Sequence, residues 1–327
     1  MIKRKLGESG LETAPLAFGG NVFGWTLDEP SSHRMLDAFV AEGFGTIDTA
    51  DVYSRWIPGN RGGESETIIG NWIRKSGKRD RILLATKVGM DMGPGGKGLS
   101  REHILRSAEE SLRRLQAEWI DLYQAHVDDP TVPFEETLEA FDRLIRQGKV
   151  RAIGASNHSA DRLHAALYTS RSERTLPAYS TLQPLYNLAE REEFETTLLP
   201  VCEKEGLGVI PYFSLASGFL SGKYRSERDL AGRARADRVR KYLTPRGFRI
   251  LEALDRVADL YTAAPATVAV AWLIARPGVS AAIASATTPD QLHDLVEATR
   301  LRLDENSIAL LDEASGYERP APLRKAG

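Results

Sequence analysis

Residues 45–54 have the sequence GTIDTADVYS, a short apolar run with polar side chains at its end. Two later runs, ILLATKVG (82–89) and IDLYQAHVDD (120–129), have the same form. The polar side chains that follow these runs are Asp48, Tyr53, Lys87 and His126. In a barrel of parallel strands the strand ends meet on one face, where catalytic side chains collect. These residues therefore predict a proton-transfer site at the mouth of such a barrel.

Short apolar runs alternate with helix-like stretches along the whole chain. We expect strands at Leu16–Gly20, Gly45–Asp48, Ile82–Lys87, Ile120–His126, Val150–Ser156, Thr181–Gln183, Val209–Tyr212 and Ala281–Ile283. Their nearly continuous apolar character is typical of strands covered on both faces. Together with the intervening helices they predict an α/β fold, the closed (β/α)8 TIM barrel. Before the first strand, two short segments flank Glu8-Ser9-Gly10 and predict a β-hairpin.

The helical pattern is clearest between Ser100 and Leu115, where apolar residues recur on one stripe and Ser100 can cap the first turn. The stretch Thr288–Gln291 has the form of a capping box, with proline at the first helical position. The chain has no internal repeat, low-complexity tract or Pro/Gly/Ser-rich linker. We therefore expect a single domain over residues 1–327.

The composition is that of an ordinary globular protein. With 327 residues, 42% of them hydrophobic, the chain can bury a large core without disulfides. The net charge of -2 argues against nucleic acid or an anionic membrane as the main partner. The one cysteine, Cys202, cannot form an intramolecular disulfide and is expected to fill a small apolar space in a helix. No apolar run suits a membrane span or a secretory signal, so we expect a cytoplasmic location.

Two long segments interrupt the alternation. Gly89–Leu99 is rich in glycine, and Lys223–Arg246, hereafter the basic segment, has nine Lys or Arg residues against three acids. Loops of this length in a compact domain are usually functional lids or disordered. From its charge alone, the basic segment is either a solvated surface loop or a lid near an anionic ligand.

Neither a Rossmann fingerprint nor a metal site is supported. Gly93–Gly98 matches G-x-G-x-x-G, but the loop begins too late after its strand, and Asp121 begins the next strand where the fingerprint needs an acid at its end. The six histidines are scattered, and neither H-E-x-x-H nor C-x-x-C occurs. We expect no bound metal, and the sequence assigns no role to His158.

Taken singly, each of the four polar residues has an ordinary structural explanation, such as a loop cap, an ion pair, a buried histidine or a packed ring. Together they form a proton-transfer group. A phenol is a poor acid at neutral pH, and the Lys87 ammonium, held charged by Asp48, is expected to lower its pKa. Tyr53 would give a proton to a carbonyl oxygen as a hydride arrives, or take it back in the reverse reaction. Neutral His126 would hydrogen-bond and orient the same oxygen.

The segments that carry these residues resemble the aldo-keto reductase superfamily. In order they are GTIDTADVYS, LLATKVG, DLYQAHVDD, VRAIGASNHS, LQPLYN, SLASGFLSGKY and IASATTPDQL. The resemblance covers nearly the whole chain and implies a (β/α)8 barrel with the N-terminal hairpin closing its bottom. It also implies an NADP(H)-dependent oxidoreductase that reversibly reduces an aldehyde or ketone to the alcohol. The catalytic four of the family fall on Asp48, Tyr53, Lys87 and His126 without a substitution.

The resemblance also implies a set of cofactor-binding positions. They are Ser156, Asn157, Gln183 and Tyr212 at the nicotinamide, Leu215 and Ser217 at the pyrophosphate, and Ser285, Thr287 and Gln291 at the adenosine end. Many members have Arg or Lys near Thr287, whereas this chain has hydroxyls and an open helix start there. We expect NADPH as the cofactor, with NADH as the alternative, and the basic segment could supply the missing charge.

The expected partner is a small carbonyl or alcohol substrate. Trp25 and Trp56 are predicted at the mouth of its pocket, either as an apolar wall or as loop anchors on the barrel rim. One alternative function is a non-catalytic NADP-binding regulatory subunit that resembles potassium-channel β subunits, which share the fold. A metal-dependent (β/α)8 hydrolase is a third hypothesis, and the sequence lacks its ligands.

Overall fold

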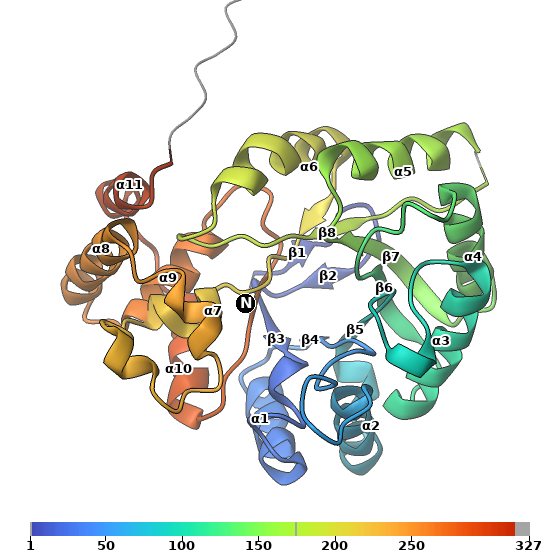
Figure 1. Ribbon diagram of the computed structural model, residues 1–327, viewed down its shortest axis with the longest axis horizontal. Coiled ribbons are helices and arrows are strands. Elements are labelled where there is room, and N and C mark those ends of the chain that lie inside the picture. Colours follow the sequence, from blue (N-terminus) through green and yellow to red (C-terminus); the bar gives the residue numbers. More distant parts are fainter. Residues whose placement is uncertain (1, 174, 318–327) are drawn as a thin grey trace, which may run out of the picture.

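The computed structural model describes residues 2–173 and 175–317. Its parallel strands form a barrel inside a ring of helices (Figure 1). The strands are β3 (Leu16–Gly19), β4 (Thr46–Asp48), β5 (Leu83–Val88), β6 (Ile120–Ala125), β7 (Val150–Ser156), β8 (Thr181–Gln183), β9 (Gly208–Val209) and β10 (Ala282–Ala284). They are neighbours in chain order from β3 to β9, and β10 pairs with β3. The predicted (β/α)8 barrel is therefore confirmed.

The barrel closes between β9 and β10 through backbone hydrogen bonds rather than a long ladder. The N–H of Ser280 donates to the Val209 carbonyl at 2.7 Å, and the N–H of Ile283 donates to the Pro211 carbonyl at 3.0 Å. A parallel bridge between Val209 and Val279 lies beside them. No edge is left for another chain to pair with at this seam.

A short antiparallel hairpin, β1 (Arg4–Lys5) and β2 (Glu12–Thr13), precedes the barrel as predicted. Arg4 donates to the carbonyls of Ile274 and Val279, each at 2.8 Å, and Ser280 Oγ donates to the Lys5 carbonyl. These contacts hold the hairpin against the barrel end opposite the strand ends that carry the polar side chains.

Helices surround the barrel and cover the outer faces of its strands (Figure 1). They are α1 (Glu29–Ala41), α2 (Glu64–Ser76), α3 (Arg101–Leu115), α4 (Phe134–Arg146), α5 (Ala160–Ser172), α6 (Leu199–Glu205), α7 (Ala236–Arg240), α8 (Pro245–Tyr261), α9 (Pro265–Ile274), α10 (Pro289–Ala298) and α11 (Glu305–Ala314). Among the described residues, no single helix is long and apolar enough to cross a membrane. Helices α8 and α9, which are bent by 95° relative to each other, reach the required length and apolar composition only when they are taken together.

Local capping follows the sequence closely, with one correction. Ser100 accepts a hydrogen bond from the N–H of His103 and begins α3 as predicted. Thr288 caps α10 by accepting from the N–H of Gln291. The predicted capping box is only half formed, because Gln291 Oε1 accepts from the N–H and hydroxyl of Thr287 instead of the N–H of Thr288.

Side chains alternate between the inside and the outside of the barrel. Residues such as Phe18, Leu84 and Ile153 face the helices and join the large outer core. Their neighbours on the same strands, Ala17, Ala85 and Ala152, belong to a small separate core inside the barrel. This period of two is the reason that polar side chains at the right strand positions point into the barrel mouth.

Candidate active site

The polar side chains at the mouth continue the inward-facing rows of the strands. Asp48 ends β4, and Lys87 follows Ala85 by two residues on β5, so both point into the barrel. Gln124 on β6 pairs in register with Lys87, and Gln183 ends β8. All four of these side chains are buried.

Lys87 is the centre of the group. Its Nζ lies 2.7 Å from Asp48 Oδ2, 2.8 Å from the Thr49 carbonyl and 2.8 Å from Tyr53 Oη. An ammonium has three N–H donors, and these three acceptors use all of them. Tyr53 Oη also lies 3.3 Å from Asp48 Oδ2. The phenol, ammonium and carboxylate predicted together from the sequence are in direct contact.

The pKa shifts within this group differ in one respect from the prediction. Burial lowers the pKa of Lys87, and Asp48 opposes that shift. Burial and the Asp48 carboxylate raise the pKa of Tyr53 well above its ordinary value. The expectation that Lys87 gives Tyr53 a lowered pKa is therefore wrong for this site, because desolvation and the adjacent carboxylate outweigh the ammonium.

His126 packs edge-on against the ring of Tyr53. The two rings have centroids 6.0 Å apart and cross at 72°. Burial, with a smaller contribution from Lys87, lowers the pKa of His126 well below its ordinary value, so the ring is neutral at pH 7. Its Nδ1 is buried and has no hydrogen-bond partner among the described residues. A neutral imidazole beside the phenol matches the prediction.

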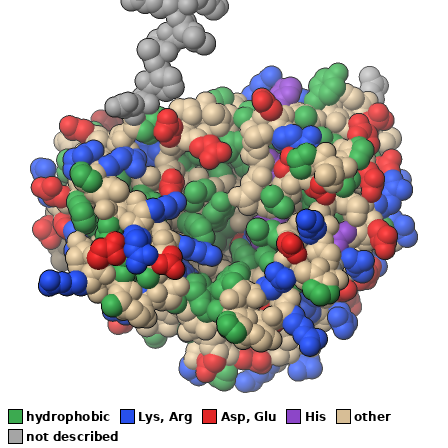
Figure 2. Space-filling model, viewed as in Figure 1, with side chains coloured by type: hydrophobic (Ala, Val, Ile, Leu, Met, Phe, Trp, Pro, Cys, Tyr) green, Lys and Arg blue, Asp and Glu red, His purple; other side chains and the backbone are tan. Residues whose placement is uncertain are grey.

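Tyr53 and His126 face a cavity of about 750 Å³ that extends from the barrel mouth to the start of α10. Figure 2 shows the hollow near the middle of this face, with hydrophobic side chains within it and basic side chains on the side of α7. This volume lies within the usual range for small-molecule and cofactor sites, about 300–1,000 Å³.

Two glutamines support Asp48 from inside the barrel. Gln183 Nε2 donates to Asp48 Oδ1 at 2.9 Å, and Gln124 Nε2 lies 3.4 Å from the same oxygen. Gln183 borders the cavity as expected, but its amide nitrogen points to Asp48. Gln124 was missed in the sequence, although a polar residue in an otherwise apolar buried strand, two positions before His126, was a usable signal.

Three of the predicted nicotinamide-binding residues form one hydrogen-bonded chain. Tyr212 Oη donates to Asn157 Oδ1 at 2.8 Å, and Asn157 Nδ2 donates to the His126 carbonyl at 2.8 Å. Asn157 Nδ2 also lies 3.1 Å from Ser156 Oγ, which donates to the Gln183 carbonyl. Asn157 has φ of 51°, and its side-chain bonds hold it in this left-handed conformation. All three residues border the cavity.

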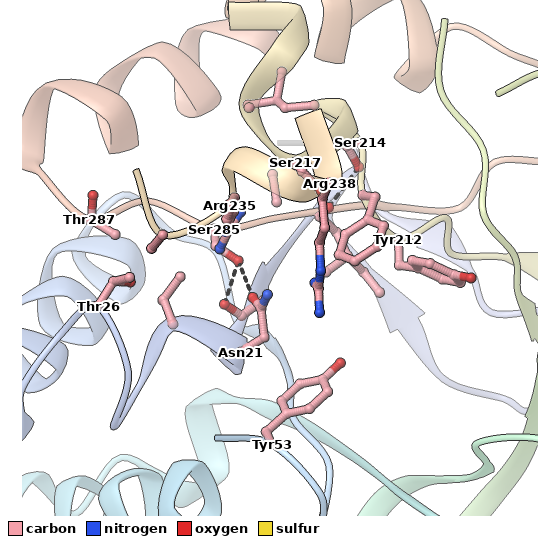
Figure 3. Close-up of a pocket in the computed structure, with 18 of the residues that line it drawn as sticks. Asn21, Thr26, Tyr53, Tyr212, Ser214, Ser217, Arg235, Arg238, Ser285 and Thr287 are labelled. Atoms are coloured by element: carbon pink, nitrogen blue, oxygen red, sulfur yellow. Dashed lines mark hydrogen bonds between the residues drawn. The ribbon is translucent and has the colours of Figure 1, made fainter. Parts of the chain in front are cut away.

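The remaining predicted cofactor residues border the other end of the same cavity. They are Leu215, Ser217, Ser285, Thr287 and Gln291. Ser285 Oγ lies 2.7 Å from both the Gly19 carbonyl and Asn21 Oδ1 (Figure 3). Asn21 was not predicted, and only the packing of the β3 loop against β10 places it here. The cavity thus joins the predicted nicotinamide end to the predicted adenosine end.

The two tryptophans have different positions. Trp56 borders the cavity, is 41% exposed, and packs edge-on against Tyr53 with centroids 6.1 Å apart. Trp25 lies behind it, edge-on at 5.6 Å, and does not border the cavity. The cation of Arg235 lies over the Trp25 ring at 5.1 Å. Trp56 therefore suits a pocket wall, and Trp25 suits an anchor that joins the first loop to the basic segment.

The basic segment borders the cavity instead of standing away in solvent. Lys223, Arg233, Arg235 and Arg238 all contribute to the cavity wall. The segment also contains α7 and a short 3-10 helix, Glu227–Leu230, so it is not a structureless loop. Of the two alternatives left by the sequence, this placement favours the lid.

His158, which had no predicted role, is buried outside the cavity wall. Its Nδ1 lies 2.8 Å from the Ser156 carbonyl, and its ring packs edge-on against Tyr179. Burial lowers its pKa. These contacts give it a structural position beneath the Ser156–Asn157 turn.

Of the described residues in the glycine-rich loop 89–99, Met90 borders the cavity.

Comparison with known proteins adds independent information. The family model described as "Aldo/keto reductase family" matches residues 15–315. The chain is 35% identical over 305 residues to "Aldo-keto reductase YhdN" of Bacillus subtilis, which covers 90% of this chain and 87% of that protein. It is 31% identical over 348 residues to "Protein tas" of Escherichia coli, with 98% and 100% covered.

A third relative has a different description. The chain is 32% identical over 332 residues to a protein of Schizosaccharomyces pombe named "Putative voltage-gated potassium channel subunit beta". That similarity covers 96% of this chain and 93% of the relative. Sequence similarity of this extent therefore includes both proteins named as reductases and proteins named as channel subunits.

Proposed function

This chain belongs to the aldo/keto reductase family and is an NAD(P)H-dependent oxidoreductase, and we propose that it reversibly reduces an aldehyde or ketone with Tyr53 as general acid. The observation that carries this proposal is the contact of Tyr53 Oη with Lys87 Nζ at 2.8 Å, at the edge of a cavity that His126 also borders. A carbonyl oxygen between the phenol and the imidazole would be within reach of both.

The raised pKa of Tyr53 suits the reductive direction. The phenol keeps its proton at neutral pH and is therefore in the form that can donate. When the proton moves to the carbonyl oxygen, the phenolate that remains is next to the Lys87 ammonium. Asp48 holds that ammonium through a 2.7 Å ion pair. In the reverse direction the same phenolate takes the proton from the alcohol.

His126 orients the carbonyl oxygen and stabilises its developing charge. Because burial keeps the imidazole neutral, one ring nitrogen carries a proton and can donate a hydrogen bond into the cavity. A donor placed in advance where negative charge develops contributes about 2.7–4 kcal/mol in known oxyanion sites. The Asn157 side chain, bonded to the His126 carbonyl, keeps the histidine backbone in place.

The cavity fits an extended nicotinamide dinucleotide, which supplies the hydride when bound. Ser156, Asn157 and Tyr212 would hold the nicotinamide, since an aromatic face and amide or hydroxyl groups suit that ring. At the far end, the N-terminus of α10 faces the cavity through Thr287 and Gln291, and such a terminus favours anions. The cavity wall is therefore suited to both ends of the cofactor.

We propose that NADPH is preferred over NADH because the basic segment replaces the missing cation near Thr287. Arg233 and Lys223 border the cavity, and neither has an acid within ion-pair distance among the described residues. The extra phosphate of NADPH would gain a charge-assisted contact there.

The cofactor preference is tested with Arg233→Gln. We expect the Kd of NADPH, measured by quenching of protein fluorescence, to rise about tenfold while the Kd of NADH stays the same. Arg228→Gln, in the same segment but outside the cavity wall, is the control. Equal weakening of both cofactors would show that Arg233 does not read the additional phosphate.

The proposed activity is tested with a panel of carbonyls and alcohols, each run with NADPH and with NADH. Oxidation of NADPH with 4-nitrobenzaldehyde at ordinary turnover, about 1–10³ s⁻¹, supports a reductase. Tight NADPH binding with no turnover across the panel contradicts it and favours the second candidate, a non-catalytic NADP-binding regulatory subunit. The similarity to proteins named as potassium-channel β subunits is the observation behind that candidate.

The last part of the proposal concerns the domain count, the partners and the cellular location of the protein. We propose that residues 1–327 act as one domain with a small-molecule partner in the cytoplasm, without nucleic acid or membrane as a main partner. Size-exclusion chromatography and limited proteolysis of the purified chain test the domain count.

A further inference from the structure

The cavity wall has an excess of cationic over acidic side chains. Four cationic side chains border it, Lys223, Arg233, Arg235 and Arg238, whereas Asp294 is the one acidic side chain of the described cavity wall. None of the four cations forms an ion pair with a described acid. Charged side chains that face a cavity without a protein counter-ion are available for an anionic ligand.

One of these cations, Lys223, lies at the predicted pyrophosphate end, with Arg233 and Arg235 nearby. The Nζ of Lys223 lies 3.6 Å from the position that a Cβ on Gly218 would occupy, directly beside Ser217. Burial and the nearby Arg235 and Arg233 lower the pKa of Lys223, as expected for a group close to other cations. This cluster faces the part of the cavity that suits the phosphates of the cofactor.

Arg238 has a different environment. Its guanidinium lies 5.5 Å from the centroid of Phe213, the residue after Tyr212 at the predicted nicotinamide end. In Figure 3 its side chain extends from α7 into the cavity, toward the space between Tyr212 and Tyr53, whereas Arg235 turns toward Ser285. Arg238 therefore faces the reacting end of the cavity.

The helix that carries Arg238 is anchored on its other sides. Val239 is fully buried, and Arg240 donates to Glu227 and Asp237 on the outer surface. Lys241 forms an ion pair with Glu190. Because its neighbours on α7 have their own partners, Arg238 is the side chain of this short helix that remains directed into the cavity.

We propose that Arg238 binds a carboxylate on the carbonyl substrate, so that the enzyme acts on anionic aldehydes or ketones. The inference rests on the proposed reductase function. The nicotinamide end of the cofactor carries no phosphate, so a guanidinium there has no cofactor anion to neutralise. Its planar fork suits a carboxylate with two parallel hydrogen bonds. Trp56 and Phe213 provide apolar surfaces for the rest of the molecule.

The test compares 4-carboxybenzaldehyde with its neutral match, methyl 4-formylbenzoate, in wild type, Arg238→Gln, Arg238→Lys and Arg240→Gln. We expect Arg238→Gln to reduce the acid-to-ester ratio of kcat/KM about tenfold or more, through KM of the acid. Arg238→Lys should retain part of the preference, and Arg240→Gln all of it. The kinetics of the ester and the Kd of NADPH should stay unchanged in Arg238→Gln.

Two outcomes would overturn the proposal. One is an unchanged acid-to-ester ratio in Arg238→Gln, and the other is a raised Kd of NADPH with equal losses for both aldehydes, which assigns Arg238 to the cofactor. If wild type reduces neither aldehyde, the reductase function fails separately. In that case benzoate and benzamide are titrated into the complex with NADP⁺ by tryptophan fluorescence. Benzoate binding that disappears in Arg238→Gln supports the anion site, and equal binding by both proteins refutes it.

Discussion

Tyr53 lies between two groups that act on its proton in opposite directions. Burial and Asp48 raise its pKa and keep the phenol protonated. The Lys87 ammonium, 2.8 Å from the hydroxyl oxygen, would stabilise the phenolate that the proposed transfer leaves. A donor in a reversible reaction needs both properties, because it must hold the proton before hydride transfer and tolerate its loss afterwards.

Replacing Tyr53 by phenylalanine removes only the hydroxyl. We expect Tyr53→Phe to lower kcat by about 10²–10⁴-fold, the usual contribution of general acid catalysis, while the Kd of NADPH stays the same. Steady-state kinetics and fluorescence titration measure the two quantities. Tyr168→Phe is the matched control, because Tyr168 is 62% exposed on α5. An unchanged kcat in Tyr53→Phe would end the assignment of Tyr53 as the acid.

Asp51 is a second unusual acid, two residues before Tyr53. It is buried, its Oδ1 has no hydrogen-bond partner among the described residues, and Glu66 lies nearby. Burial, with the Glu66 charge, raises the pKa of Asp51 to about 8. At neutral pH the folded protein therefore keeps a proton on Asp51 that the unfolded chain releases, and this difference costs stability.

The sign of the effect gives a pH-dependent prediction. Below pH 4 Asp51 is protonated in both states, and between about pH 4 and about pH 8 the wild type loses about 1.4 kcal/mol of unfolding free energy per pH unit at this site. Asp51→Asn lacks this loss, so its advantage in denaturant unfolding should widen from pH 5 to pH 8. Parallel pH profiles of the two proteins would contradict the raised pKa.

At the scale of elements, α2 and α3 approach each other closely at Gly70. A Cβ on Gly70 of α2 would lie 2.1 Å from the Arg114 carbonyl oxygen and 2.7 Å from the Leu115 carbonyl carbon, both at the end of α3. Glycine is therefore required at this crossing, although it is a poor helix former. The approach also brings Arg114 Nε within 2.6 Å of the buried Glu66, which accepts from Thr86 as well.

Adding one methyl group at this crossing should separate the helices. We expect Gly70→Ala to lower the unfolding free energy by about 3 kcal/mol, since the contact is with backbone that cannot move aside easily. Urea unfolding followed by circular dichroism measures the change. Lys75→Ala, at an exposed position of the same helix, should change stability by less than about 0.5 kcal/mol. A neutral Gly70→Ala would mean that α2 and α3 are further apart in solution.

At the scale of the whole molecule, the barrel has two cores with different tasks. The outer core joins the strands to the helices, and the small inner core fills the barrel below the polar mouth. Leu6, in the turn of the N-terminal hairpin, belongs to the inner core and is fully buried. The hairpin therefore closes the bottom of the inner core, which lies beneath the inward-facing polar residues.

Because the hairpin lies at the end of the barrel opposite the polar mouth, we expect it to affect the stability of the fold and not the catalytic rate. Leu6→Ala should leave a cavity at the floor and lower the unfolding free energy by about 2–5 kcal/mol, whereas kcat below the unfolding temperature stays near wild type. Thermal unfolding and steady-state kinetics test the two parts. Leu260→Ala removes a side chain of the same size that is 67% exposed and should have little effect on either. Equal stability of the two variants would show that the hairpin is not part of the core.

The sequence by itself determined the barrel architecture and which polar residues gather at the barrel mouth. Apolar runs of strand length predicted all of the barrel strands to within a few residues, because strands covered on both faces must be apolar along their length. The position of a polar residue at the end of such a run determines that it faces the mouth. For that reason Asp48, Lys87 and His126 could be grouped before any coordinates.

Only the tertiary structure decided what each group touches. It showed that Gln183 donates to Asp48 across 135 residues of sequence, and that Trp56 borders the cavity while Trp25 lies behind it. It also showed that Arg238 extends into the cavity toward Tyr212 and Tyr53. It also reversed the expected pKa shift of Tyr53. The physical reason is that spacing along a strand sets the direction of a side chain. Burial and charge are instead set by loops that are remote in sequence and meet only in the folded barrel.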